Sequence, residues 1–197
     1  MVAQRIRIIA GEFGGRLLEV SEQGTRPLAD RVRQALFAIL EPRLPDTRVL
    51  DLCAGSGVAG LEALSRGAQH VQFVEISRRA TEVIRRNVRT LGLDAQVEIQ
   101  TADALTALRA HAAHVAPADL IIADPPYDDL AVRNEILELV AANPSPLATN
   151  GLLVLSGRRV KGSAAQRAPR GLRLVRALAF GETAIELYER VAAEELR

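Results

Sequence analysis

The chain has 197 residues, of which 48% are hydrophobic and 25% are charged, as is typical of a soluble globular protein. No apolar run reaches the roughly 18 residues of a membrane span, and residues 1–7 lack the apolar centre of a signal peptide. Because a single cysteine cannot form an internal disulfide, we expect a cytoplasmic protein with no membrane partner.

The N-terminal residues predict a small β-hairpin followed by a helix. Residues 5–20 resemble two short strands around a glycine-rich turn. We expect residues 1–24 to form an extension of a main domain that spans residues 25–197. Pro27 is placed in the first turn of the helix that follows. The apolar stripe of this helix leaves Arg31, Arg33 and Gln34 facing solvent or a ligand.

From residue 48 onward, strand and helix patterns alternate. The predicted strands are RVLDL, HVQFVEI, QVEIQ, ADLIIAD and GLLVLS, with helical stretches such as RRATEVIRRNVRTLG between them. This alternation predicts an α/β fold with a mostly parallel, doubly wound sheet and right-handed crossovers. The last two strands, LRLVRALAF and TAIELYERV, are joined by only a short turn, so they should pair as a C-terminal antiparallel hairpin.

A glycine-rich loop follows the first of these parallel strands. Gly55, Gly57 and Gly60 match the G-x-G-x-x-G pattern of a dinucleotide-binding loop. In parallel sheets of this kind, ligands bind beyond the carboxyl ends of the strands. Acidic residues stand at or just after four of the predicted strands: Asp51, Glu75, Asp103 and Asp124. Four acids at one edge predict a ligand site.

These acids favour S-adenosylmethionine over NAD as the ligand. Asp51 would repel the pyrophosphate of NAD, whereas it would attract the ammonium group of S-adenosylmethionine. Glu75 suits the ribose hydroxyls of either cofactor, and Asp103 could accept from the adenine amino group. An NAD-dependent oxidoreductase remains an alternative, although no residue pair here resembles a hydride-transfer site.

The segment IIADPPYDD predicts which group receives the methyl. Asp124 and the Pro125 carbonyl could accept both hydrogens of an exocyclic amine and aim its lone pair at the methyl group. The two prolines make the turn rigid. Tyr127 offers a flat face for an extruded base. The segment resembles the motif of class I methyltransferases that act on amino groups of bases in nucleic acids or of protein glutamine.

A basic segment and the three histidines allow predictions about RNA binding and metal binding. Residues 156–181 contain seven arginines and lysines and no acid, which predicts contact with RNA phosphates. The candidates for this contact are Arg158, Arg159 and Lys161. No histidine has a cysteine or carboxylate partner at ligand spacing, so we expect no metal site.

Several segments together resemble one family. The segments RIIAGEFGGRLL, TRPLADRVRQALF, LDLCAGSGVAGLEALSRGA, VEISRRA, DPPY and FGETAIELYE occur in the order seen in the RsmD family of small-subunit (16S) ribosomal RNA guanine-N2 methyltransferases. The resemblance covers nearly the whole chain. It implies a Rossmann-like class I methyltransferase fold with a seven-stranded sheet, S-adenosylmethionine as cofactor, and small-subunit ribosomal RNA as partner, either free or within a partly assembled particle. Two positions depart from the family: Cys53 replaces a frequent aromatic, and Leu28 replaces a frequent threonine.

The resemblance also implies the residues of the site. The implied cofactor contacts come from Asp51, Cys53, Ala54, Gly55, Ser56, Gly57, Glu75, Ile76, Asp103 and Ala104. The implied contacts to the target amine come from Asp124, Pro125, Pro126 and Tyr127. The residues implied to line the edge of the site, beside a hairpin that reaches toward RNA, are Arg26, Pro27, Asp30 and Arg33. An adenine-N6 DNA methyltransferase, which carries a similar DPPY segment, and a non-catalytic RNA-binding module remain alternatives.

Overall fold

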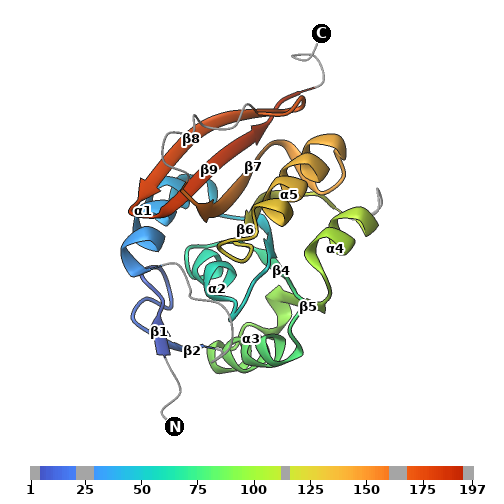
Figure 1. Ribbon diagram of the computed structural model, residues 1–197. Helices are drawn as coiled ribbons and strands as arrows, with labels where there is room; N and C mark the ends of the chain where they lie inside the picture. The colour runs from blue at the N-terminus through green and yellow to red at the C-terminus, as the bar shows by residue number, and fades with distance from the viewer. Residues whose placement is uncertain (1–4, 21–28, 112–115, 160–167, 193–197) are drawn as a thin grey trace. The chain divides into compact units, whose positions relative to one another are not determined.

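The computed structural model describes residues 5–20, 29–111, 116–159 and 168–192. The chain divides into two compact units, Met1–Asp103 and Ala104–Arg197 (Figure 1). Predicted residues Arg26, Pro27, Leu28 and Lys161 lie outside the described residues. None of the described helices is both long and apolar enough to cross a membrane.

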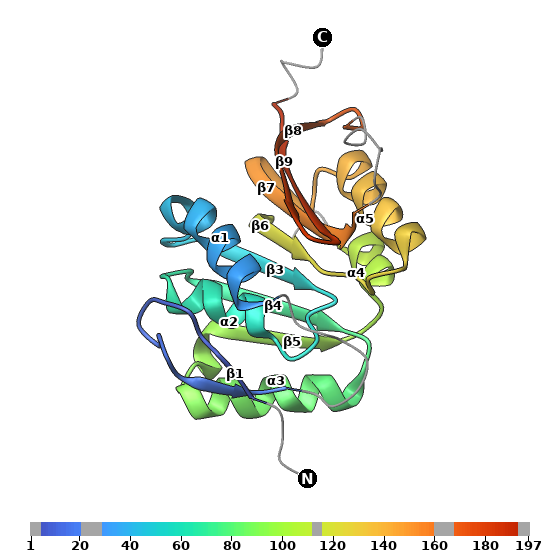
Figure 2. The same ribbon diagram turned by 60° about the vertical axis from the view of Figure 1, so that its left-hand side comes forward.

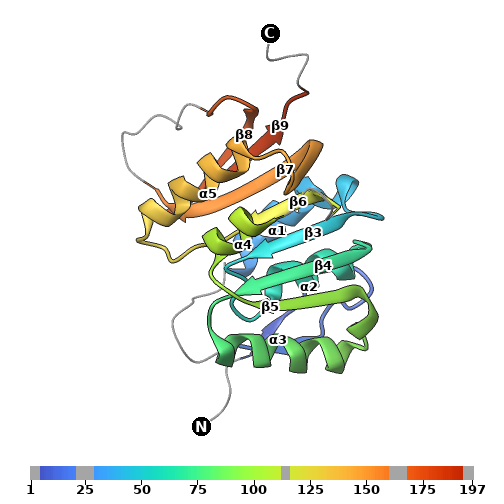
Figure 3. The ribbon, with the colours of Figure 1, turned by 90° about the vertical axis from the view of Figure 1, so that its right-hand side faces the viewer.

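The first unit is built on three parallel strands in the order β5-β4-β3 (Figure 3). These are β3 (Arg48–Leu52), β4 (His70–Glu75) and β5 (Val97–Thr101). Helix α2 (Val58–Ser65) packs on β3 and β4, and α3 (Arg78–Leu91) packs on β4 and β5. Short 3-10 helices span Glu41–Arg43 and Asp94–Gln96. Strands β3 and β4 are mostly buried, which explains why both appear in the sequence as apolar runs.

Before these strands come a hairpin and helix α1 (Asp30–Leu40). Strands β1 (Arg5–Arg7) and β2 (Leu17–Glu19) pair antiparallel, as predicted for the hairpin. The hairpin is fastened to the rest of the unit by Glu62 of α2, whose side chain is fully buried. Its two carboxylate oxygens accept hydrogen bonds from Ile9 N at 2.7 Å and Ala10 N at 3.2 Å, and from Arg66 Nε at 2.8 Å. One carboxylate therefore pairs backbone donors of the hairpin that would otherwise be unsatisfied.

Arg33 belongs to the same buried cluster. Its side chain is only 1% exposed, and its Nη1 lies 3.7 Å from the Glu62 carboxylate. Its Nη2 donates to the Arg7 carbonyl at 2.9 Å and to Asp30 Oδ1 at 2.8 Å. The prediction that Arg33 faces solvent or a ligand is therefore wrong. The apolar periodicity of α1 could not reveal that the hairpin covers this face of the helix.

The second unit contains four strands in the order β6-β7-β9-β8. Strands β6 (Ala118–Ala123) and β7 (Leu147–Arg158) are parallel, and β9 (Thr183–Arg190) pairs antiparallel with both β7 and β8 (Leu172–Phe180). Helices α4 (Ala104–Ala110) and α5 (Leu130–Ala142) pack against each other, and α5 packs on β7. The predicted parallel strands and the C-terminal antiparallel hairpin are confirmed. The division into residues 1–24 and 25–197 stays a prediction.

Candidate active site

The glycine-rich loop joins β3 to α2 and has an alternating left-handed backbone. Cys53 and Gly55 both have φ of 56°, and Gly57, the N-cap of α2, has φ of 76°. Glycine adopts this region without a steric cost, whereas a cysteine there is strained. Strain of this kind concentrates at functional sites, so the loop is a candidate ligand cradle.

The third glycine lets α2 approach the sheet closely. A Cβ atom on Gly60 would lie 2.3 Å from Cε1 of Phe73 on β4, far inside van der Waals contact. Glycine at this position therefore serves helix–strand packing, as the third glycine of the G-x-G-x-x-G pattern does. The close approach brings the N-terminus of α2 to the carboxyl end of β3.

The buried side chain of Asp51 lies at the N-terminus of helix α2. Its side chain is 2% exposed, and its Oδ2 accepts a hydrogen bond of 2.9 Å from the backbone N–H of Gly60. The carboxylate thus lies where a dinucleotide pyrophosphate would need positive potential, and its charge would repel that group. The arrangement favours a ligand with a cationic group over NAD.

Glu75 ends the neighbouring strand β4 and ties it to the loop. Its Oε2 accepts from Gly55 N and its Oε1 from Ser77 N, both at 2.8 Å. A carboxylate has about four lone-pair sites, so each oxygen can still accept from a ribose hydroxyl. The next residue, Ile76, is 69% exposed, which suits an apolar contact with a bound ring. Because β3, β4 and β5 are adjacent and parallel, the structure brings Asp51, Glu75 and Asp103 to one edge of this unit.

In the second unit, Asp124 follows directly after β6 and is bonded by Ser156 of β7. The register pairs Ala123 with Leu155, so the next residue on each strand lies side by side. The Ser156 hydroxyl, which is 2% exposed, donates to Asp124 Oδ1. Burial raises the pKa of Asp124 to about 6, and the hydrogen bond from Ser156 opposes that rise. Asp124 is therefore an acceptor whose charge depends on pH just below neutrality.

The turn after Asp124 is fixed to the start of α5 by hydrogen bonds. Pro125 is buried and Pro126 is exposed; the Pro126 carbonyl accepts from Asp129 N at 2.8 Å. Asp129 in turn caps α5, because its Oδ1 accepts from Val132 N at 3.0 Å. The Pro125 carbonyl remains the predicted partner of Asp124 in binding an amine. The turn is thus fixed to the start of α5.

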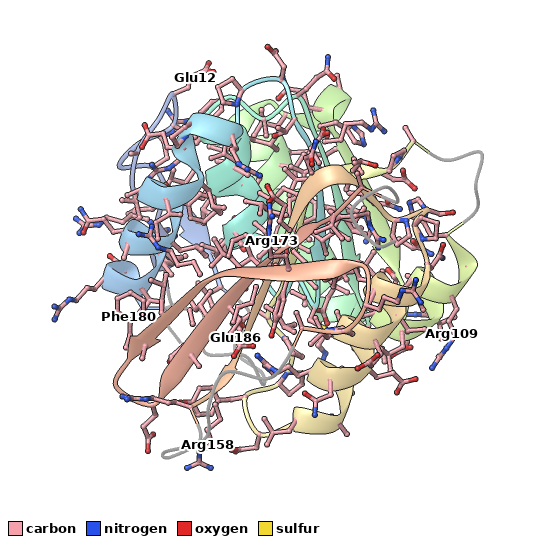
Figure 4. All side chains as sticks on the ribbon, turned by 90° about the horizontal axis from the view of Figure 1, so that it is seen from above. Glu12, Arg109, Arg158, Arg173, Phe180 and Glu186 are labelled. Atoms are coloured by element: carbon pink, nitrogen blue, oxygen red, sulfur yellow. The ribbon has the colours of Figure 1, made fainter. Side chains whose placement is uncertain are left out.

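Tyr127 is exposed at the end of this turn, and Arg158 braces it. The tyrosine is 38% exposed, and the guanidinium of Arg158 lies 5.9 Å from its ring centroid. Arg158, labelled in Figure 4, also forms an ion pair of 2.7 Å with Asp128 and lies 4.0 Å from Glu182. Its charge is therefore matched by carboxylates outside the acid-free segment that suggested a phosphate contact. Arg159 is exposed, and its contact with RNA stays a prediction.

Sequence reasoning missed a buried polar cluster behind Ser156. Arg133 of α5 pairs with Glu186 of β9, which is labelled in Figure 4. Glu186 also accepts from the hydroxyl of Tyr188 at 2.6 Å. Burial and the Glu186 carboxylate raise the pKa of Tyr188. A Cβ atom on Gly157 would lie 2.7 Å from Cδ of Arg133, so glycine there makes room for the arginine. The only signal in the sequence was the polar pair Ser156–Gly157 at the end of an apolar strand.

Two further candidate residues are Asp30, at the start of α1, and Ala104, at the start of α4. Asp30 pairs with Arg7 at 3.2 Å and with Arg33, and the hydrogen bond from Arg33 is the main cause that lowers the pKa of Asp30. Ala104 begins α4 in the second unit, whereas the other candidate cofactor residues lie in the first. Among the residues that the structure describes, no group of three or more metal-ligating side chains is placed to hold a metal ion.

Comparison with known proteins points to one family. The family model described as Conserved hypothetical protein 95 matches residues 6–189. The chain is 33% identical over 192 residues to Ribosomal RNA small subunit methyltransferase D of Escherichia coli (strain K12), covering 97% of this chain and 93% of that relative. It is 38% identical over 129 residues to a Bacillus subtilis (strain 168) protein named "Putative rRNA methyltransferase YlbH", covering 65% of this chain and 70% of that relative.

Solved structures agree with these relatives. The Escherichia coli structure named "Putative methyltransferase yhhF" has a TM-score of 0.83 and 33% identity, covering 96% of this chain and 99% of that one. A hypothetical protein of Thermus thermophilus has a TM-score of 0.75 and 30% identity, covering 92% and 98% of the two chains. The predicted α/β, Rossmann-like class I methyltransferase fold is confirmed.

Proposed function

The chain belongs to the Conserved hypothetical protein 95 family, the RsmD family, and on that premise we propose that it methylates the exocyclic N2 amine of a guanine in small-subunit ribosomal RNA. The relatives' names support an RNA methyltransferase. The observation that carries the choice of an amine is the hydrogen bond from Ser156 to Asp124 at the head of the DPPY turn. That contact holds a carboxylate at a strand end, where it can accept from a substrate N–H.

The residues of the first unit fit S-adenosylmethionine as the methyl donor. This cofactor supplies a methyl group on a positively charged sulfonium. Asp51 provides negative charge for the cationic amino-acid end, and Glu75 can accept from the ribose hydroxyls. Asp103 is proposed to accept from the adenine amino group. Cys53, Ala54, Gly55, Ser56, Gly57, Ile76 and Ala104 are proposed to complete the contacts.

Asp124 and the Pro125 carbonyl are proposed to orient the target amine. The lone pair of an exocyclic amine is delocalised into the base, so the free amine is a poor nucleophile. Two acceptors that bind both N–H groups favour a pyramidal nitrogen with its lone pair directed at the methyl group. The N–C bond forms as the S–C bond breaks, and the nitrogen then loses a proton to Asp124 or to water. A pKa of about 6 leaves Asp124 mostly ionised at neutral pH, as this role requires.

Tyr127 is proposed to stack on the extruded guanine. Its ring is exposed at the end of a turn that is fixed to α5, and Arg158 supports it by a cation–π contact. Stacking on an aromatic ring is worth about 1–3 kcal/mol per base. Arg158 therefore serves the site by holding the stacking residue.

The decisive experiment follows the methyl group to its nucleoside. Small-subunit ribosomal RNA, naked and in particles, is taken from a strain that lacks this protein and incubated with tritiated S-adenosylmethionine and the purified enzyme. We expect label in N2-methylguanosine, with the preferred substrate form showing the faster labelling. Label in N6-methyladenosine, or no label in either RNA form, would contradict the proposal. The Asp124→Asn variant is assayed beside the wild-type enzyme. It keeps the shape of the side chain and removes its charge, so it tests the carboxylate alone.

A further inference from the structure

Helix α3 carries a dense row of arginines on its exposed face. Its buried side packs on β4 and β5 through residues such as Val83, Ile84 and Val88. At about 100° per residue, its exposed charged residues fall on one continuous face. These residues are Arg78, Arg79, Glu82, Arg85, Arg86 and Arg89. We call the five arginines the arginine face; Glu82 is the only acid in the helix.

The placement of two of these arginines opposes helix stability. Arg78 and Arg79 are the first two residues of α3, where the helix dipole is positive, and the first turn of α3 contains no acid. Ser77 caps the helix, because its hydroxyl accepts from Ala80 N at 3.3 Å. The cap favours the helix, whereas two cations at this end interact unfavourably with the helix dipole. Two cations placed against the helix dipole indicate that these positions serve something other than the stability of the helix.

The arginine face begins at the candidate cofactor edge. Arg78 and Arg79 follow Glu75 and Ile76 within a few residues, at the carboxyl end of β4. Arg78, Arg85 and Arg89 then lie along one line of the helix, which spans about 16 Å at 1.5 Å per residue. A strand with a phosphate about every 3.4 Å along its axis presents several phosphates over that length.

The N-terminal hairpin lies beside this face (Figure 2). The side chain of Asn87 accepts from Glu19 N at 2.9 Å and donates to the Glu19 carbonyl at 3.0 Å, so it pairs with β2 like a short strand. Arg86 forms an ion pair of 2.8 Å with the Glu19 side chain. The hairpin and the arginine face therefore form adjoining parts of one surface within the first unit.

We propose that the arginine face of α3 binds phosphates of the substrate RNA and guides the strand toward the cofactor edge. Arginine presents a planar fork that pairs with phosphate in two hydrogen bonds, and a repeated row of such forks suits a polyanion. The proposal rests on the proposed function in one respect, namely that the substrate is RNA.

The test compares three variants with the wild-type protein. Arg85→Gln with Arg89→Gln removes two charges; Arg85→Lys with Arg89→Lys keeps them. The matched control is Arg43→Gln with Arg109→Gln, because these arginines lie on segments that lead into the starts of β3 and β6. The dissociation constant for a small-subunit ribosomal RNA transcript is measured against salt concentration, together with S-adenosylmethionine affinity and the melting temperature.

We expect the glutamine variant to lose about 0.7–0.9 in the slope of log K against log salt for each lost contact. Its KM for RNA should rise, whereas its cofactor affinity and melting temperature should stay at wild-type values. The lysine variant should keep most of the slope. An unchanged slope in the glutamine variant, or an equal loss in the control or lysine variant, would overturn the proposal. Failure of the proposed function would instead appear as wild-type protein that binds RNA but does not methylate it.

Discussion

Replacing Ser156 with alanine should move the pH dependence of methyl transfer to higher pH. In the wild type, burial raises the pKa of Asp124 to about 6 in spite of the Ser156 hydrogen bond. Because the ionised carboxylate is the better acceptor, kcat/KM for the RNA, which reports ionisation of the free enzyme, should rise with pH through about 6 and level off above 7. A hydrogen bond to a charged group contributes about 1.5–3 kcal/mol, and one pKa unit corresponds to about 1.4 kcal/mol. Without the hydroxyl, the inflection should therefore move up by about one to two pH units.

The magnitude is measurable at RNA concentrations below KM. A shift of about one unit leaves Asp124 roughly half ionised at pH 7, so kcat/KM of Ser156→Ala should fall at least about twofold there and recover as the pH rises further. Tritium transfer is assayed from pH 5 to pH 9. Asp124→Asn should show low activity with no inflection in this range. Ser145→Ala, a serine in the loop before β7, is the matched control and should keep the wild-type profile.

Two results would refute this reasoning. A wild-type kcat/KM that is flat from pH 5 to pH 8 would show that ionisation of Asp124 does not limit the reaction. An inflection at the same pH in the wild type and in Ser156→Ala would show that the hydroxyl does not tune the carboxylate. A lower plateau in Ser156→Ala with a shifted inflection would instead indicate that the serine both tunes and positions Asp124.

Asp124→Asn should melt higher than the wild type at pH 7 but not at pH 4: since the folded-state pKa of about 6 exceeds the usual value of 3.8, the stability of the wild type falls as pH rises between them, by up to about 3 kcal/mol. Glu62→Gln should lower the free energy of unfolding by about 3 kcal/mol or more, measured by urea denaturation, because it removes a fully buried carboxylate and leaves the buried Arg33 with Asp30 as its charged partner; a loss below about 1 kcal/mol would contradict this. Gly60→Ala should cost about 1–3 kcal/mol and weaken cofactor-induced stabilisation in thermal melts, because its Cβ would collide with Phe73; wild-type melting with and without cofactor would refute it.

The sequence predicted the parallel strands and the acids at their ends because both depend on short-range patterns. Buried strands such as β3 and β4 are apolar runs, and each is followed at once by its loop residues. Gly60 was found for the same reason, since it lies about one helical turn after Gly57, the N-cap of α2. Local spacing was therefore sufficient to find the cofactor edge.

The contacts that sequence could not predict join segments that are far apart in the chain. Arg33 was expected to be exposed because nothing in its own helix shows that the hairpin and Glu62 enclose it. Arg158 lies in a segment without acids, yet its partner Asp128 comes from the turn after β6. Ser156 needed the register of β7 against β6 before its place beside Asp124 could be known. Charge counts within a segment therefore overstate how much positive charge is available to RNA.

The attachment of the hairpin through Glu62 has a consequence for protein engineering. Strands β1 and β2 have only three residues each, so the hairpin depends on contacts outside itself. A graft of residues 5–20 alone would leave the amides of Ile9 and Ala10 without their carboxylate. A functional transplant would have to carry a glutamate at the matching position of the host helix and an arginine to balance it. The smallest set of residues that would carry the hairpin to another scaffold is thus discontinuous in the chain.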